Sequence, residues 1–133
     1  MTKNNKAADY DVPIRCKHKP IFATKDYALI DGYYKNDTDV LGLSLGKAQW
    51  SGDEFIPSVK VWRQKNGKIT RNSEEITLTR ALDLATLTVQ ALDSVENGCE
   101  PKKYTTMHGS VVIEKVTTPN FVNLKHQLIG HLN

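Results

Sequence analysis

Apolar residues recur at every second position in residues 40–50, VLGLSLGKAQW, where the leucines are Leu41, Leu43 and Leu45. This period is typical of a half-buried β-strand. The glycines of the segment favour a bend or the close approach of another backbone. Residues 55–65 predict the next strand after a short turn.

Asn66-Gly67 predicts a tight hairpin turn after this second strand. A type I′ turn needs positive φ at both central positions, and Asn-Gly satisfies that need best. The turn predicts a register in which four pairs face each other: Lys65 and Lys68, Trp62 and Arg71, Lys60 and Ser73, and Val59 and Glu74.

This register assigns the side chains of the hairpin to two faces. One face carries Lys60, Trp62, Gln64, Ile69 and Arg71. The other face carries Val59, Val61, Arg63, Thr70 and Asn72. Because two valines point the same way, we expect the second face to meet the core near the open end of the hairpin.

Residues 79–97 change to the period of a helix, with Thr79 or Thr77 as the N-cap and Asn97-Gly98 as the stop. Apolar residues between 81 and 95 cover more than half of its circumference. An ordinary surface helix needs an apolar arc of only about 100°. We therefore expect this helix to be covered on two sides, by the C-terminal segment or by a second copy of the chain.

The remaining patterns complete the predicted fold. Residues 12–20 predict a short edge strand, 26–34 a helical turn broken at Gly32, and 102–118 a strand with a bulge at Gly109. Thr118-Pro119 opens a final helix. The predicted class is α+β: an antiparallel sheet of residues 40–50, 55–65 and 68–78, packed by one long central helix, with a C-terminal strand and helix. Residues 1–11 form a flexible N-terminus and 12–133 a single domain.

Composition places the chain among ordinary globular proteins. Of its 133 residues, 39% are hydrophobic and 25% are charged, with a net charge of +3, so a nucleic-acid ligand must be argued from the placement of charges. The N-terminus has no apolar signal region and no apolar run reaches membrane length. With two cysteines in the chain, we expect a cytoplasmic protein without a disulfide framework and without membrane contact.

Motifs for catalysis, metals and cofactors are missing from the sequence. GLSLGK at residues 42–47 has one residue too few between its glycines for a P-loop, and Ala48 replaces the required hydroxyl. The cysteines and histidines lack metal-ligand spacing, and we interpret Asp31, Asp37 and Asp39 as loop carboxylates, because an EF-hand pattern is absent. Glu74 and Glu75 are adjacent and point to opposite faces of a strand. We expect a non-enzymatic protein with no cofactor and no metal.

The basic hairpin favours single-stranded nucleic acid as the ligand. Residues 60–71 hold five cations, no carboxylate and one tryptophan. An exposed indole would stack on a base while the neighbouring cations bind phosphates. The candidate binding residues are Lys60, Trp62, Arg63, Lys65, Lys68 and Arg71. The competing interpretation is that Trp62 is a core residue, with Arg71 stacked on its edge.

The stretch SVKVWRQKNGKITRNSEEITLTRALDLATLTVQAL, residues 58–92, resembles the single-stranded-DNA-binding transcriptional coactivator (Whirly-like) family. This resemblance implies a curved sheet that binds single strands through Lys60, Trp62, Lys68 and Arg71, and a homodimer through the 79–97 helix. The longer stretches HKPIFATKDYALIDGYYKNDTDV and LGLSLGKAQW also resemble an uncharacterised bacterial protein family of unknown function.

A protein-interaction or small-ligand-sequestering accessory protein of bacterial or phage origin is the alternative function. Its ligand would lie in a groove between the sheet and a tyrosine-rich segment, Tyr27, Tyr33 and Tyr34. A shielded Trp62 favours this alternative. An enzyme is the third hypothesis, and it needs a pocket where Asp31, Asp37 or a histidine converge.

Overall fold

The computed structural model describes residues 11–35, 37–70, 73–98, 103–106, 108–114, 116 and 118–132. Contacts divide the chain into two compact units, Met1–Ala81 and Leu82–Asn133. Antiparallel sheets and helices confirm the α+β class. This division does not test the prediction of one domain over 12–133, which stays a prediction. Residues 1–10 of the predicted flexible N-terminus lie outside the described residues.

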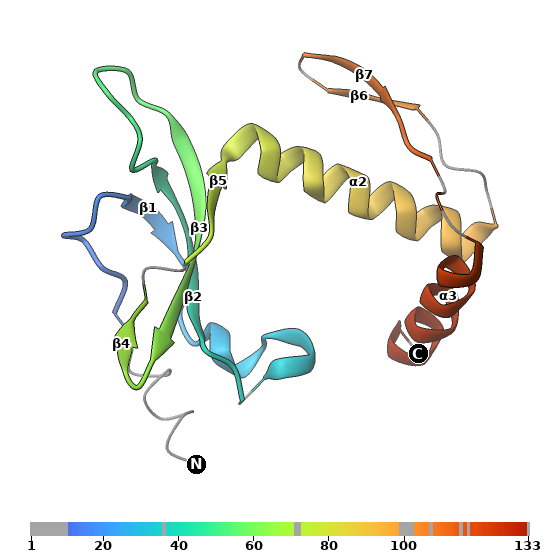
Figure 1. Ribbon diagram of the computed structural model, residues 1–133, viewed down its shortest axis with the longest axis horizontal. Coiled ribbons are helices and arrows are strands. Elements are labelled where there is room, and N and C mark those ends of the chain that lie inside the picture. Colours follow the sequence, from blue (N-terminus) through green and yellow to red (C-terminus); the bar gives the residue numbers. More distant parts are fainter. Residues whose placement is uncertain are drawn as a thin grey trace. The chain divides into compact units, whose positions relative to one another are not determined.

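The first unit is built on an antiparallel sheet with the strand order β1-β2-β3-β4, in which β5 also pairs with β3 (Figure 1). Its strands are β1 (Lys19–Ala23), β2 (Val40–Lys47), β3 (Pro57–Lys65), β4 (Lys68–Ile69) and β5 (Glu75–Thr77). The predictions of strands at 40–50 and 55–65 are confirmed. Because β2 pairs with both β1 and β3, it lies in the interior of the sheet.

The hairpin turn between β3 and β4 forms as predicted. Asn66 has a φ of 55° and Gly67 a φ of 82°, which are the positive values that a type I′ turn requires. Lys65 lies opposite Lys68. The Asn-Gly turn therefore sets the register at this end of the ladder.

Farther from the turn the predicted register is wrong by two residues. Lys60 pairs with Glu75 instead of Ser73, and Val59 with Ile76 instead of Glu74. The predicted strand 68–78 is divided into β4 and β5, and the chain between them contains two residues more than a continuous ladder would hold. A shift of two residues preserves which face each side chain occupies. The predicted pairing of Trp62 with Arg71 lies outside the described residues.

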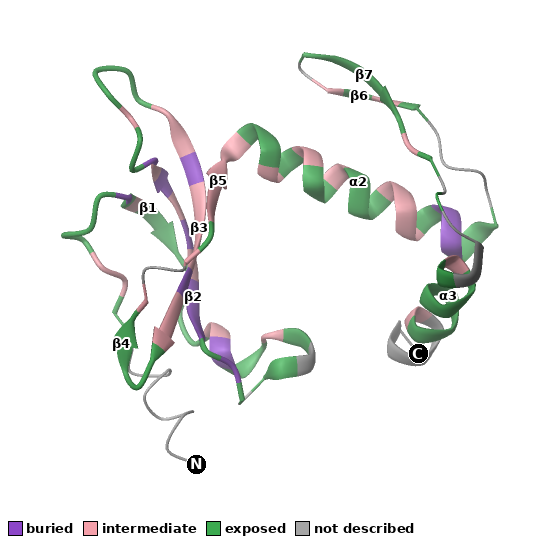
Figure 2. Ribbon diagram, in the orientation of Figure 1, coloured by how far each residue is buried: buried purple, intermediate pink, exposed green. Residues whose placement is uncertain are grey.

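The more buried face of β3 is the one that carries Trp62, so the prediction that the valine face meets the core is wrong. Ser58 is 0% exposed and Trp62 is 1% exposed, whereas Val59 and Val61 are half-buried (Figure 2). The reason lies on β2, where Gly42 stands opposite Trp62. A glycine without a side chain leaves a space over the strand that an aromatic ring fills.

The segment before β2 folds back against this core. The predicted helical turn is replaced by two 3₁₀ turns, η1 (Tyr27–Leu29) and η2 (Gly32–Tyr34). The break between them falls at Gly32, as predicted, where φ is 48°. Ala28 from η1 packs with Leu41 and Trp62. The edge strand β1 begins at Lys19, later than the predicted strand of 12–20.

The second unit contains most of α2 (Leu78–Asn97), the strands β6 (Lys103–Thr106) and β7 (Gly109–Val112), and α3 (Thr118–Leu132). Both helices are confirmed, and Gly98 with a φ of 66° ends α2 as predicted. The predicted strand 102–118 is instead a two-stranded hairpin, with Gly109 at a φ of 143° beginning β7.

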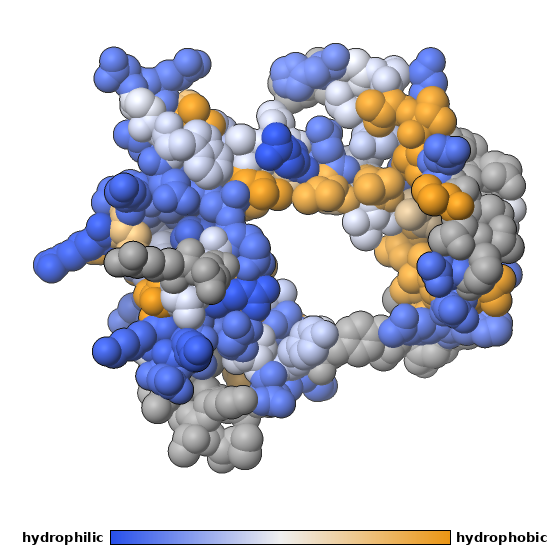
Figure 3. Space-filling view, viewed as in Figure 1, coloured by the Kyte–Doolittle hydropathy of each residue, from blue (hydrophilic) through white to orange (hydrophobic). Residues whose placement is uncertain are grey.

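The apolar arc of α2 is largely exposed in the described structure, and Figure 3 shows apolar side chains along this helix. The exposed residues include Leu82, Leu84, Leu87 and Val89. What covers this arc stays a prediction. None of the described helices combines the length and the apolar character that crossing a membrane requires.

Gly46→Ala should destabilise the sheet. A Cβ at residue 46 would lie 2.0 Å from the carbonyl oxygen of Lys19 and 2.7 Å from Cα of Pro20, so β1 would have to move. Overpacking of this kind costs about 1–3 kcal/mol, which urea denaturation measures. The matched control is Gly52→Ala, because a Cβ at Gly52 meets nothing within 4 Å. Equal stability of the two variants would contradict the packing of β1 on β2.

Candidate functional site

A cluster of polar side chains lies on the buried face of the first sheet. Nδ1 of His18 lies 3.0 Å from Oγ of Ser58 and 3.0 Å from Oε2 of Glu75. Nε2 of the same ring lies 2.9 Å from Oγ of Ser44. Ser58 donates its hydroxyl to Glu75 at 2.7 Å. We call these four residues the polar cluster.

Trp62 and Lys60 pack against the polar cluster and contact its members. The indole N–H of Trp62 donates to Ser44 at 2.9 Å, and its ring meets His18 edge-on with 5.9 Å between centroids. The Nζ of Lys60 lies 4.9 Å from the indole centroid and 3.8 Å from a carboxylate oxygen of Glu75. Oε2 of Glu75 thus accepts hydrogen bonds from His18, Ser58 and the backbone N–H of Gln49. Oε1 has no hydrogen-bond partner among the described residues and has only the charge of Lys60 nearby.

The pKa of Glu75 is lowered from its usual value, although its side chain is almost fully buried. Burial by itself raises the pKa, but hydrogen bonds from Ser58, the backbone of Gln49 and His18 favour the ionised form more strongly. An ionised carboxylate accepts and cannot donate. His18 therefore presents Nδ1–H to Glu75, and in the neutral ring Nε2 accepts from Ser44.

Glu75, His18 and Ser44 lie in the order of a hydrolase triad, and Ser44 is the serine of Gly42-Leu-Ser-Leu-Gly46. The surroundings do not fit that chemistry. A nucleophile elbow presents its serine at an exposed turn, whereas Ser44 is 5% exposed in the middle of β2. The backbone of β2 is also paired on both sides, so this part of the sheet offers no free N–H pair for an oxyanion. The polar cluster is a buried hydrogen-bonded network within the sheet.

The predicted nucleic-acid residues do not form one exposed surface. Trp62 is 1% exposed and its indole cannot stack on a base in this fold; the side chain of Lys60 is 12% exposed and lies over that indole. Arg63 points to the opposite face and binds two carboxylates. Lys65 and Lys68 are exposed at the turn as expected. Arg71 lies outside the described residues.

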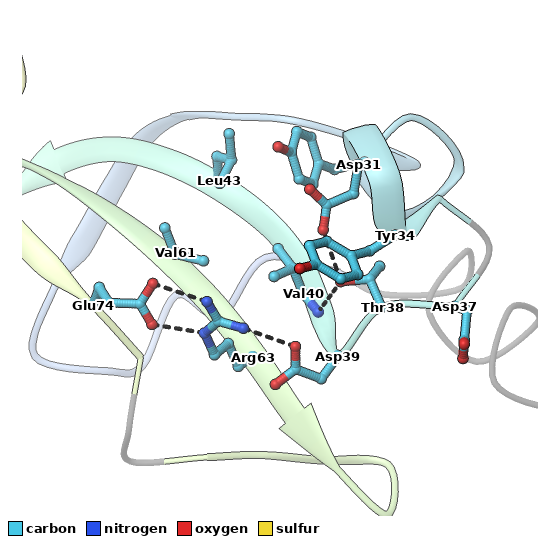
Figure 4. Close-up of a pocket in the computed structure, with 11 residues that line it drawn as sticks. Asp31, Tyr34, Asp37, Thr38, Asp39, Val40, Leu43, Val61, Arg63 and Glu74 are labelled. Carbon is cyan, nitrogen blue, oxygen red and sulfur yellow. Dashed lines mark hydrogen bonds and ion pairs between the residues drawn. The ribbon is translucent and has the colours of Figure 1, made fainter. Parts of the chain in front are cut away.

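A pocket of about 450 Å³ opens on the opposite face of the sheet, between β2–β3 and the η1–η2 segment (Figure 4). We call it the acidic pocket. Its floor comes from Val40, Leu43 and Val61. The polar lining consists of Tyr27, Tyr34, Thr38, Asp31, Asp37, Asp39, Arg63 and Glu74. The pocket lies where the alternative function expects a groove, between the sheet and the tyrosine-rich segment, and Tyr27 and Tyr34 line it together with Asp31 and Asp37. The side chain of Tyr33 lies outside the described residues.

Arg63 is held between two carboxylates at one side of the acidic pocket (Figure 4). Its guanidinium donates to Glu74 at 2.6 and 3.0 Å and to Asp39 at 2.7 Å. The hydrogen bonds from Arg63 are the largest cause of the lowered pKa of Glu74, and those same bonds raise the pKa of Arg63. The side chains of Glu74 and Glu75 thus point to opposite faces of the sheet, as expected for adjacent residues of a strand.

The other side of the acidic pocket is organised by Asp31. Its carboxylate accepts the hydroxyl of Thr38 at 2.7 Å, and the same Thr38 oxygen accepts the N–H of Val40 at 3.0 Å. Burial raises the pKa of the Tyr27 hydroxyl, and the negative charge of Asp31 and a hydrogen bond to it raise that pKa further. Tyr27 therefore stays a neutral phenol, a donor beside a carboxylate.

The acidic pocket carries an excess of negative charge. Four carboxylates line it together with one guanidinium, that of Arg63. Among the residues that the structure describes, no group of three or more histidine, cysteine or carboxylate side chains is arranged to hold a metal ion. The carboxylates are thus distributed around a cavity and do not converge on a point.

Sequence reasoning missed the polar cluster and the partners of Arg63. The available signal was the row of small residues Gly42, Ser44 and Gly46 that alternates with leucines in β2. Such a row needs cover from large side chains, and Trp62 lies opposite Gly42. No local pattern connects His18 with Glu75, because 57 residues separate them.

The fold and the site define an α+β protein with an acidic surface pocket and a buried polar network. A model described as a family of unknown function (DUF6530) matches residues 10–122, and the chain belongs to that family. No curated protein and no solved structure matches it significantly. The resemblance to a family without an assigned function is thus supported, and the comparisons show no likeness to the coactivator family.

Trp62 should be protected from collisional quenching. In Trp50→Phe the remaining tryptophan is 1% exposed, whereas in Trp62→Phe the remaining Trp50 is 44% exposed. We expect an acrylamide quenching constant that is several-fold smaller for the first variant than for the second. Similar constants would contradict the burial of the indole and would restore the base-stacking hypothesis.

Glu75→Gln should weaken the dependence of stability on acid pH. Because the pKa of Glu75 is lower in the folded state, its stabilising contribution is complete above the unfolded pKa and is lost as pH falls through the folded value. The free energy of unfolding of Glu75→Gln should therefore fall less steeply below about pH 4.3. The exposed Glu54 supplies the control Glu54→Gln, and equal slopes in both variants would refute the assigned role.

Proposed function

We propose that this protein is a non-enzymatic binding protein that holds the cationic group of a small organic ligand in the acidic pocket. The observation that supports the proposal is the lining of that pocket, where four carboxylates and two tyrosines surround one guanidinium that is already paired. A pocket of about 450 Å³ is within the usual range for small-molecule sites. A lining in which carboxylates outnumber cationic side chains attracts a cation.

An organic cation fits this lining better than a bare metal ion. A metal needs several ligands at one point, whereas the described carboxylates lie around the cavity. Tyr27 and Tyr34 add aromatic faces, and aromatic rings bind alkylated ammonium groups through cation–π attraction. An ammonium or guanidinium group would meet both kinds of partner.

Catalysis finds less support in the same pocket. Its described lining contains no histidine, cysteine or serine, so a nucleophile and a base of the usual kind are not brought together there. Asp31 accepts a hydrogen bond from Thr38 and interacts with the Tyr27 hydroxyl. A carboxylate held in this way would orient a ligand by accepting a hydrogen bond from it. We therefore propose binding in preference to an enzyme.

Single-stranded nucleic acid, the ligand that the hairpin sequence favours, also finds less support. Its binding through this hairpin would depend on Lys65 and Lys68, which are exposed at the turn. Two lysines supply a weak, salt-dependent attraction to phosphates. The aromatic plate that would add affinity is buried as Trp62.

The homodimer and the cytoplasmic location remain proposals. The exposed apolar residues of α2, Leu82, Leu84, Leu87 and Val89, support a homodimer through the 79–97 helix, because an apolar row of this size normally receives cover. Cys16 is free and exposed, which suits a reducing compartment. Both proposals are independent of the ligand.

Asp31→Asn should weaken the binding of small cations. We would titrate ethylammonium, tetramethylammonium and guanidinium at low salt and follow amide chemical shifts around the acidic pocket by NMR. Removing one charge at about 4 Å from the ligand in partly wet surroundings costs about 1 kcal/mol or more, so the dissociation constant should rise about fivefold. Raised salt should weaken binding in the wild type.

The matched control is Asp53→Asn, because Asp53 is exposed in the turn before β3 and outside the pocket. It should bind cations as the wild type does, and acetate should cause no shifts in the pocket. Absence of cation binding at low salt, or equal losses in both variants, would overturn the proposal. If single-stranded DNA were retarded in a gel at low salt while no cation bound, the hairpin hypothesis would replace it.

A further inference from the structure

A second cavity of about 450 Å³ lies on the same face of the sheet as the acidic pocket. Leu43 and Val61 line both cavities, so the two are neighbours across the middle of β2 and β3. On one side of these shared residues lies the acidic pocket with its carboxylates. The second cavity runs the other way, toward the edge strand β1.

The second cavity is lined by an apolar strip that crosses three strands. The strand register sets Leu43 opposite Val61 and Leu45 opposite Val59, and Phe22 of β1 stands beside Leu45. Side chains at these alternating positions share one face. We call Phe22, Leu43, Leu45, Val59 and Val61 the apolar strip.

The apolar strip is accessible on this face. Phe22 is 73% exposed, and the leucines and valines of the strip are half-buried. An exposed phenylalanine beside four aliphatic side chains leaves apolar surface in contact with water at a cavity. The contrast with the opposite face is sharp, since the polar cluster there is almost fully covered.

We infer that the ligand of this protein is an amphiphilic organic cation, with its charged group in the acidic pocket and an apolar tail along the apolar strip. The inference rests on the proposed function and adds the chemical class of the ligand. Its basis is that Leu43 and Val61 line both cavities, so that a cavity lined by carboxylates lies next to an apolar one. A ligand with one cationic end and one apolar end complements both cavities at once.

Charge separates this ligand from other amphiphiles. A fatty acid would place its carboxylate against Asp31, Asp39 and Glu74, which repel it. A neutral chain would bury its tail equally well but would place no cation beside Asp31. The geometry therefore favours a long-chain amine or a similar cation.

The test is a series of n-alkylamines from ethylamine to octylamine, titrated at low salt below their aggregation limits. Burial of each added methylene should tighten binding by up to about three- to fourfold, until the tail passes the end of the strip. The alkyl carboxylates of equal length serve as the charge control and should bind far more weakly. The readout is the ratio of octylamine affinity to ethylamine affinity.

Phe22→Ala should reduce this ratio, because it removes one wall of the strip from a side chain that is exposed and contributes little to the core. Val59→Thr, which preserves shape and adds a polar hydroxyl, should also reduce it. Val112→Ala is the matched control, since Val112 is 75% exposed in β7 of the second unit, and it should leave the ratio unchanged.

Each outcome separates the two proposals. If ethylamine binds and the affinity is independent of chain length, the amphiphile inference falls while the proposed function stands. If no amine of any length binds, the proposed function falls and the inference falls with it. A chain-length gain that persists unchanged in both Phe22→Ala and Val59→Thr, or carboxylates that bind as tightly as amines, would also overturn the inference.

Discussion

The hydrogen bond from the indole of Trp62 to Ser44 fixes which side of the first sheet is interior. Ser44 also meets His18, whose ring is bound to Ser58 and Glu75, so the largest ring of the sheet and its most buried charge belong to one network. Apart from Oε1 of Glu75, which has no hydrogen-bond partner, the side chains of this network are paired, and a paired buried network favours one arrangement because losing a partner is costly. Once this face is interior, the acidic pocket lies on the other face, with Arg63.

That division explains why a sequence with a basic hairpin yields an acidic pocket. Two of the hairpin cations are used within the fold: Lys60 lies over the indole near Glu75, and Arg63 is neutralised by Asp39 and Glu74. The carboxylates that remain in the pocket come from the η1–η2 segment and the residues after it. Net charge of the chain therefore says little about the charge of its cavity.

Local signals in the sequence were sufficient for much of the fold. The period of two in β2, the Asn66-Gly67 turn and the Gly98 stop of α2 depend on neighbouring residues alone, and all three are confirmed. The interior face could not be chosen in this way, because β3 carries a tryptophan on one side and valines on the other. The site depended on contacts between residues far apart in the chain, such as the bond between Asp39 and Arg63, and alternation within one strand does not encode them. No pattern in the sequence predicted the two extra residues between β4 and β5, which shift the register of the ladder.

Hydrogen exchange of the two indole N–H groups, followed by NMR, tests the central claim most directly. The N–H of Trp62 donates to Ser44 in the interior, whereas Trp50 is 44% exposed. The account predicts that the Trp62 proton exchanges only through large-scale unfolding of the sheet, orders of magnitude more slowly than the Trp50 proton. Equally fast exchange at both indoles would contradict it, because Trp62 would then be at the surface and the assignment of the two faces would be reversed.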